Sequence, residues 1–244
     1  MKYLNILAFI TVLTVNALAN ILPINDLNTG EVSALYPNLF TPAGLTFSIW
    51  SVIYLFLAGY CVYPFISKQD RRARDIAPLF WITCILNCTW IFIWHNLFVE
   101  LSLVIMALLL VVLCIIYIRL HRHTPVSKLE KWLVYKPFSL YLAWICVAII
   151  ANTAAVLVSH GFDPPSAANW VIGMIIATQI IVYLISKQYR DIAFSLVIIW
   201  ALTGIIIKRV DAEPLFQPIV IACILAIIFD AWVALHFRYR KSLT

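Results

Sequence analysis

Lysine and arginine residues fall into every second gap between the long apolar stretches of this chain. Of the 17 basic residues, 15 follow this rule: Lys2, those in 68–74, those in 119–136, Lys187 and Arg190, and those in 238–241. Only Lys208 and Arg209 lie in the other set of gaps. Cytoplasmic loops of multi-spanning membrane proteins carry such an excess of basic residues. The alternation therefore predicts a polytopic membrane protein and also its orientation.

The composition excludes an ordinary soluble domain. Mean hydropathy is +0.98 and 11% of residues are charged, against about a quarter in soluble domains. The net charge of +6 does not indicate a nucleic-acid partner, because the basic residues lie beside the ends of apolar stretches. There they set orientation and attract lipid head groups. We therefore expect the lipid bilayer of the cell (plasma or inner) membrane as the partner.

A span needs roughly 20 apolar residues, and uniform runs of that length form helices rather than barrel strands. The expected fold class is an all-α polytopic membrane helix bundle with both termini cytoplasmic. Residues 23–44, which are rich in proline and glycine, are expected to form a structured external loop without a helix. The predicted spans are about 3–22, 45–66, 77–97, 101–120, 137–159, 169–186, 192–207 and 215–236. The external gaps hold the acids Asp26, Glu31, Glu100, Asp163, Asp211 and Glu213.

The first stretch has two interpretations. The segment from Ala17 to Ala19 fits a cleaved signal peptide, while the whole stretch is long enough for a retained span. The retained helix is favoured, and the remaining topology is the same in both cases.

No catalytic or metal-binding constellation is evident, so we do not expect an enzyme, a cofactor or a metal. The six cysteines all lie in apolar stretches, where thiols act as small hydrophobic groups. Cys84 and Cys88 are one turn apart but have no second pair or histidine beside them.

Aromatic and amide residues of three predicted spans lie at similar depth below the external surface. With a rise of about 1.5 Å per residue, Trp50 lies about 8 Å deep, and Trp90 and Asn152 about 10 Å deep. Asn87 shares a face with Trp90. These residues either hold helices together or border a ligand cavity. By contrast, Trp81, Trp132 and Trp170 lie near span ends and are expected to form interfacial belts, and Trp94 and Trp232 fit either role.

Three motifs resemble the TspO family (TspO/MBR), also called tryptophan-rich sensory protein or translocator protein. The segment from Thr41 to Tyr54 is similar to the family's loop-to-helix-2 motif of Pro-Pro-Gly, Phe, and Trp and Tyr four apart. Leu86 to Trp90 resembles its Leu-Asn-x-x-Trp motif on helix 3. Trp144, Ala148 and Asn152 have the spacing of four found in its helix-5 pattern.

The resemblance implies a five-helix unit over residues 1–159, which leaves 160–244 as an extension of three additional transmembrane helices. It also implies a sensory or ligand-binding function. The ligand would be a porphyrin, a haem-related tetrapyrrole or another flat hydrophobic molecule, in a pocket under the first external loop. A homodimer is left open. The pocket residues that the resemblance implies are Trp50, Tyr54, Asn87, Trp90, Trp144, Ala148 and Asn152.

The chain departs from the family pattern at several positions and looks like a divergent, extended member. Pro42-Ala43 stands where the family has Pro-Pro, and Pro137 lies further from Trp144 than in the family. No Tyr followed by Lys or Arg comes after Asn152, so sterol binding is not expected.

Asp230 is the one acid well inside a predicted span. An ionisable residue in a membrane suggests proton or ion coupling. The alternative function is therefore a secondary transporter with Asp230 as the coupling residue. Asp230 could instead be partly hydrated and reach towards Arg238 or Arg240, or it could pair with a neighbouring helix. Gln179 and Thr153 could be its polar neighbours if the fold brings them close.

Overall fold

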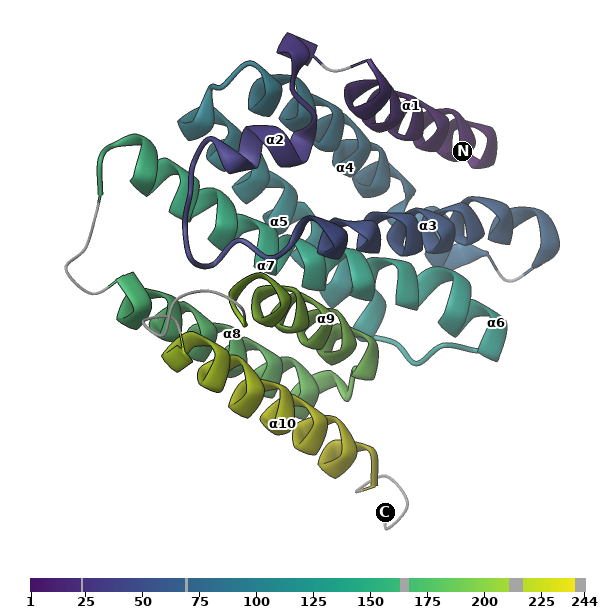
Figure 1. The fold of residues 1–244 in the computed structure, drawn as a ribbon. Coiled ribbons are helices and arrows are strands. Elements are labelled where there is room, and N and C mark those ends of the chain that lie inside the picture. The colour runs from purple at the N-terminus through teal and green to yellow at the C-terminus, as the bar shows by residue number, and fades with distance from the viewer. Residues whose placement is uncertain (23, 69, 163–166, 211–216, 240–244) are drawn as a thin grey trace. The chain divides into compact units, whose positions relative to one another are not determined.

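The predicted all-α polytopic fold is confirmed. The computed structural model describes residues 1–22, 24–68, 70–162, 167–210 and 217–239, and within them eight helices are long and apolar enough to cross a membrane (Figure 1). The charged residues at 163, 211, 213, 240 and 241, on which the predicted topology also rests, lie outside the described residues. The long helices are α1 (Lys2–Ile21), α3 (Ile49–Ile66), α4 (Arg71–His95), α5 (Val99–His121), α7 (Lys136–Ser159), α8 (Ala167–Tyr189), α9 (Ile192–Arg209) and α10 (Gln217–Tyr239).

Two helices begin earlier than charge counting predicts, because helices continue past the apolar region. α4 starts at Arg71, where Arg71 and Asp75 form an i,i+4 pair at 3.9 Å. The helix that ends at Ser159 is preceded by α6 (Lys128–Glu130) and a π-helical segment, Lys131–Tyr135. A wider turn is common where a proline interrupts the regular hydrogen bonds, and Pro137 follows two residues after this segment.

The expectation that the first external loop has no helix is wrong. Residues Thr29–Ala34 form α2, and a 3-10 turn covers Ile24–Asp26. Asn28 caps α2 by accepting from the backbone N–H groups of Gly30 and Glu31, and the Glu31 carboxylate accepts from the Asn28 N–H at 2.7 Å. This reciprocal capping box is a recognisable sequence signal for a helix start, and the proline and glycine content of the loop obscured it.

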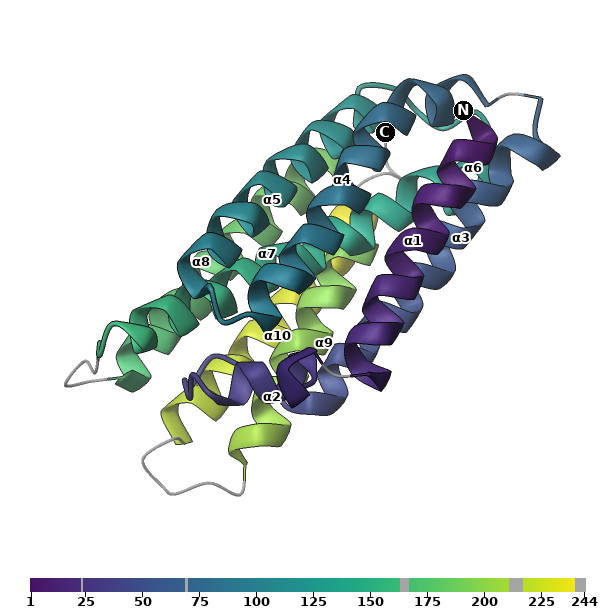
Figure 2. The ribbon, with the colours of Figure 1, turned by 90° about the horizontal axis from the view of Figure 1, so that it is seen from above.

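The chain divides into two compact units. Unit 1 contains Met1–Tyr36 and Trp50–Ile145, and unit 2 contains Pro37–Ile49 and Cys146–Thr244. Within unit 1, α1, α4 and α5 lie side by side (Figure 2). Within unit 2, α8, α9 and α10 pack together.

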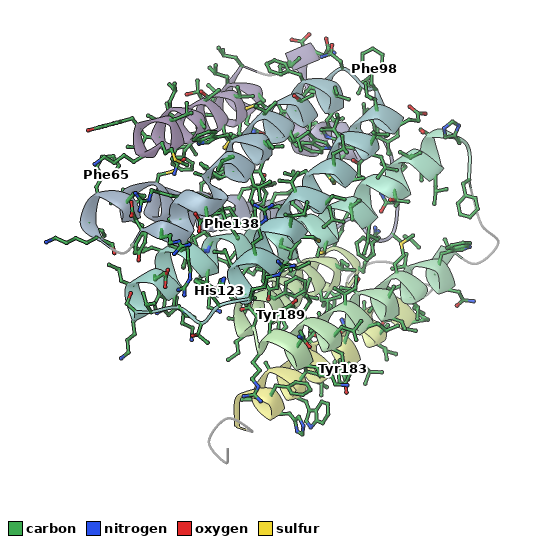
Figure 3. The ribbon with its side chains drawn as sticks, turned by 180° about the vertical axis from the view of Figure 1, so that it is seen from behind. Phe65, Phe98, His123, Phe138, Tyr183 and Tyr189 are labelled. Carbon is green, nitrogen blue, oxygen red and sulfur yellow. The ribbon has the colours of Figure 1, made fainter. Side chains whose placement is uncertain are left out.

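An aromatic group joins three helices in the core of unit 1. The Tyr60 ring lies 5.0 Å from Phe80 and 5.0 Å from Phe138, both edge-on (Figure 3 labels Phe138). All three side chains are almost fully buried. The Tyr60 hydroxyl donates to the Ala73 carbonyl at 2.8 Å, so its polar end is satisfied. The rings supply the apolar packing and the hydroxyl fixes the register of α3 on α4.

A buried ion pair closes one end of unit 1. Arg72 Nη1 lies 2.8 Å from Glu130 Oε2, and Glu130 is 1% exposed. The same carboxylate oxygen accepts from the Val126 N–H at 2.6 Å. A buried carboxylate needs such partners, because an unpaired charge out of water is strongly destabilising. The pair therefore ties the start of α4 to the segment before α7.

In unit 2, α9 holds the segment 37–49, which contains the 3-10 turn Gly44–Ser48. The Ala43 N–H donates to the Gly204 carbonyl at 3.0 Å, and Trp200 Nε1 donates to the Thr46 carbonyl at 2.8 Å. Arg209 Nη2 donates to the Asn38 carbonyl at 2.7 Å. Arg209 is one of the two basic residues that break the charge alternation, and this bond gives it a structural role.

Gly204 permits this close approach, and its replacement is predicted to destabilise unit 2. A Cβ built at Gly204 would collide with the Thr46 side chain, including its Cβ, so the segment would have to move. We expect Gly204→Ala to cost about 1–3 kcal/mol, as overpacking does, and to lower the thermal midpoint in detergent. The matched control is Gly173→Ala on α8, where an added Cβ meets nothing within 4 Å. The control should be neutral or slightly stabilising, and equal midpoints for the two variants would contradict a close contact between Gly204 and Thr46.

The predicted orientation can be tested at two exposed positions. Leu35, after α2, is predicted to face outside, and Lys128 of α6 to face the cytoplasm. A membrane-impermeant maleimide should label Leu35→Cys in intact cells and Lys128→Cys only after permeabilisation. Labelling of Lys128→Cys in intact cells would show the opposite orientation.

Candidate ligand-binding site

Trp50, at the start of α3, lies in the middle of an aromatic group in unit 1. Its ring stacks on Tyr54 at 5.4 Å and meets Tyr141 and Trp144 of α7 edge-on at 5.7 and 6.4 Å. Trp50 and Tyr54 are half-buried, whereas Tyr141 and Trp144 are buried. Stacked and edge-on pairs at these distances are attractive. The structure therefore brings together Trp50, Tyr54 and Trp144, three of the residues that the sequence singled out.

Asn87 is the polar centre beside these rings. Its Nδ2 donates to the Tyr141 hydroxyl at 3.2 Å, and its Oδ1 accepts from Asn16 Nδ2 at 2.8 Å. Asn87 is 3% exposed, so these bonds satisfy an amide that would otherwise be costly in an apolar interior. The amide thus connects α1, α4 and α7.

The sequence reasoning missed Asn16 and Tyr141. Asn16 could have been found by the argument used for Asn87, since it is an amide within a predicted span. Tyr141 lies three residues before Trp144 and so faces the same side of α7. No motif pointed to it, because a tyrosine in an apolar helix is ordinary.

The Tyr54 hydroxyl differs from the other polar groups of this site. It is buried and has no hydrogen-bond partner among the described residues. The Tyr54 ring also contacts Phe9 of α1, with 6.5 Å between the ring centres. A hydroxyl in an apolar setting without a partner costs free energy. This donor is therefore available to an acceptor atom of a ligand.

Trp90 belongs to a second aromatic group, near the C-terminal end of α4. It stacks on Trp94 at 5.5 Å, and Trp94 lies 6.1 Å from Tyr36. Trp94 is buried, and its Nε1 donates to the Thr29 carbonyl at 3.3 Å. The buried His95 meets the Thr29 hydroxyl at 2.9 Å through Nε2. This group anchors α2 on α4, and Trp94 is thus a core residue rather than part of a belt.

The last two residues of the predicted set lie in unit 2. Asn152 is 3% exposed and Ala148 is half-buried. Both follow Trp144 at steps of four along α7, so the three share one face of that helix. Their role in a ligand site stays a prediction.

The tryptophans expected at the interface, and Trp232, for which both roles were left open, divide by exposure. Trp132, Trp170 and Trp232 are 56%, 51% and 53% exposed, as residues facing lipid head groups would be. Trp81 differs, because it is half-buried and its Nε1 donates to Asn5 Oδ1 of α1 at 2.7 Å. Trp81 therefore helps hold α1 on α4 within unit 1. Cleavage after Ala19 would remove this contact together with the bond from Asn16.

Asp230, in unit 2, is fully buried and faces Gln179 of α8. Neither the carboxylate nor the amide reaches hydrogen-bonding geometry with any group in the described part of the chain. The predicted polar neighbour Gln179 therefore lies beside Asp230. The complete burial of Asp230 disagrees with the alternative of a partly hydrated side chain. The side chains of Arg238 and Arg240, the other proposed partners, lie outside the described residues.

The described helices define the class of protein, which is a polytopic α-helical membrane protein. A family model described as TSPO-like protein matches residues 2–235, so the chain belongs to the TSPO-like protein family. The match extends over all eight apolar helices and therefore includes the last three. No curated protein and no solved structure matches the chain.

Proposed function

We propose that this membrane protein binds porphyrin-like or other flat hydrophobic ligands and acts in sensing them. The observation that carries the proposal is the aromatic group around Trp50, with the unpartnered Tyr54 hydroxyl at its side. Aromatic walls with a few placed polar groups are typical of small-molecule sites. Membership in the TSPO-like family supports the same ligand class.

Each residue would have a distinct role in the proposed site. Trp50 and Trp144 meet edge-on, so that one of them can offer a flat face to a planar ring system. Asn87 would hold Tyr141 in place, and Tyr54 would donate to a ligand carboxylate or carbonyl. Trp90, Ala148 and Asn152 enter the proposal through the family motifs and their spacing. We also propose the cell membrane as the location, with both termini cytoplasmic.

Trp50→Ala tests the site. The substitution removes the ring that contacts Tyr54, Tyr141 and Trp144. Aromatic pairs contribute about 0.5–1.5 kcal/mol beyond area burial, and 1.4 kcal/mol is one decade of affinity. We expect affinity for protoporphyrin IX to fall roughly tenfold, measured by tryptophan quenching in detergent.

The matched control is Trp170→Ala, which removes an exposed ring on α8 and should leave affinity unchanged. Thermal midpoints of both variants show whether they are folded. Equal affinity of folded Trp50→Ala and the unsubstituted protein would place the ligand elsewhere.

A second candidate function, secondary transport, is favoured by Asp230. A buried carboxylate that has no hydrogen-bond partner among the described groups is costly unless it carries a proton or holds a cation. We predict that Asp230→Asn, which preserves shape, abolishes gradient-driven porphyrin uptake into proteoliposomes without reducing binding in detergent. Asp75→Asn, at an exposed acid of α4, is the control. Uptake that is unchanged in folded Asp230→Asn would exclude the coupling role.

A further inference from the structure

A cavity of about 410 Å³ lies in unit 2, between the last turns of α8 and α10. Its lining combines three basic side chains with three aromatic ones. Figure 3 labels Tyr183 of α8, which meets Phe237 of α10 edge-on at 5.9 Å. The lining residues are Tyr183, Lys187, Arg190, Trp232, His236 and Phe237.

Two of the basic side chains, Lys187 and Arg190, come from the end of α8 and the turn that follows it. Arg190 follows α8 directly and has a positive φ of 52°, the left-handed conformation that often ends a helix. The next residue, Asp191, caps α9 by accepting from the Ala193 N–H at 3.2 Å. This turn brings Arg190 to the same cavity as Lys187, one turn earlier on α8.

The cavity is positively charged and contains no carboxylate in its lining. Within the described residues, neither Lys187 nor Arg190 belongs to an ion pair. The Lys187 ammonium lies 5.9 Å from the centre of the Tyr183 ring, a cation–π contact that leaves its donors usable. An anion is the ligand that such a lining attracts. Arginine and lysine together are typical of phosphate sites.

Aromatic rings fix the third basic group. The His236 ring stacks on Trp232 at 5.0 Å and meets Phe237 edge-on at 5.1 Å. His236 is thus held between two rings at the wall of the cavity.

Exposed apolar side chains occur next to the lining residues along α8 and α10. Leu184 and Leu235, each adjacent in sequence to a lining residue, are 56% and 52% exposed, and Trp232 is 53% exposed. These side chains belong to helices that cross the membrane, so we expect lipid chains against them. A soluble anion would contact only the basic lining of the cavity. An amphipathic anion would contact the basic lining with its head group and the exposed apolar side chains with its acyl chains.

We propose that this cavity binds the phosphate-bearing head group of an anionic phospholipid. Lys187 and Arg190 contact the phosphate oxygens, Trp232 and His236 flank the head group, and the acyl chains follow Leu184 and Leu235. On the predicted orientation the lipid belongs to the cytoplasmic leaflet, where anionic lipids attract basic residues. Free phosphate shares the chemistry of the head group and is the alternative source.

The test is binding of a fluorescent phosphatidylglycerol to the full chain in neutral detergent, followed by anisotropy. We expect saturable binding that unlabelled phosphatidylglycerol reverses and phosphatidylcholine does not. The double variant Lys187→Gln/Arg190→Gln should weaken binding about thirtyfold, from the loss of two charges near a phosphate. Lys187→Gln alone should weaken it about fivefold, and thermal midpoints show that each variant is folded.

The control is Lys128→Gln/Lys131→Gln, which removes the same charge from exposed positions of unit 1 outside the cavity. If this control binds the lipid within twofold of the unsubstituted protein, the result supports the proposal. Equal weakening by both double variants would show general charge attraction and overturn the site. Displacement by inorganic phosphate at lipid-like concentrations would show a soluble-anion site and overturn the lipid assignment. Neither result depends on Trp50 or on the proposed porphyrin site.

Discussion

Hydrogen bonding of amide groups inside an apolar bundle is the constraint on which unit 1 depends. In a membrane, helices satisfy their own backbone, so side-chain amides must find partners on other helices. Asn16, Asn87 and Tyr141 form one such chain across α1, α4 and α7. These bonds form only when α1, α4 and α7 are neighbours, so they favour this arrangement of the three helices. It also positions Tyr141 against Trp50, and so links the stability of the bundle to the geometry of the proposed site.

The long helices could be predicted from the sequence, because length, hydropathy and charge alternation are properties of each segment alone. All eight predicted spans correspond to helices. The errors lie at the ends of spans and in the first external loop. Arg71–Asp75 continues α4 past the apolar region, since an i,i+4 ion pair supports a helix in water as well. The short α2 depends on a capping box, a local signal that hydropathy does not report.

The candidate site could be predicted in part. Depth counting indicated Trp50, Trp90, Trp144, Asn87 and Asn152, and the family motifs added Tyr54 and Ala148. Depth does not give the direction in which a side chain points around the helix axis, so the stacking of Trp90 on Trp94 was not foreseen. The partners of Asn87 were missed for another reason. These partners lie on other helices, and tertiary packing decides which helices are neighbours. The contacts of Trp200 and Gly204 could not be predicted for the same reason.

One of the last three helices, α9, contacts the part of the chain that carries the family's loop motif. Segment 37–49 packs with Cys146–Thr244 as one compact unit, through bonds from Trp200 and Arg209 and through the bare backbone of Gly204. A glycine at such a contact allows two backbones to approach closely, as small residues do between membrane helices. Loss of α9 would leave the Thr46 and Asn38 carbonyls without these donors. This dependence gives a physical reason for a family match that extends to residue 235 rather than ending with the fifth span.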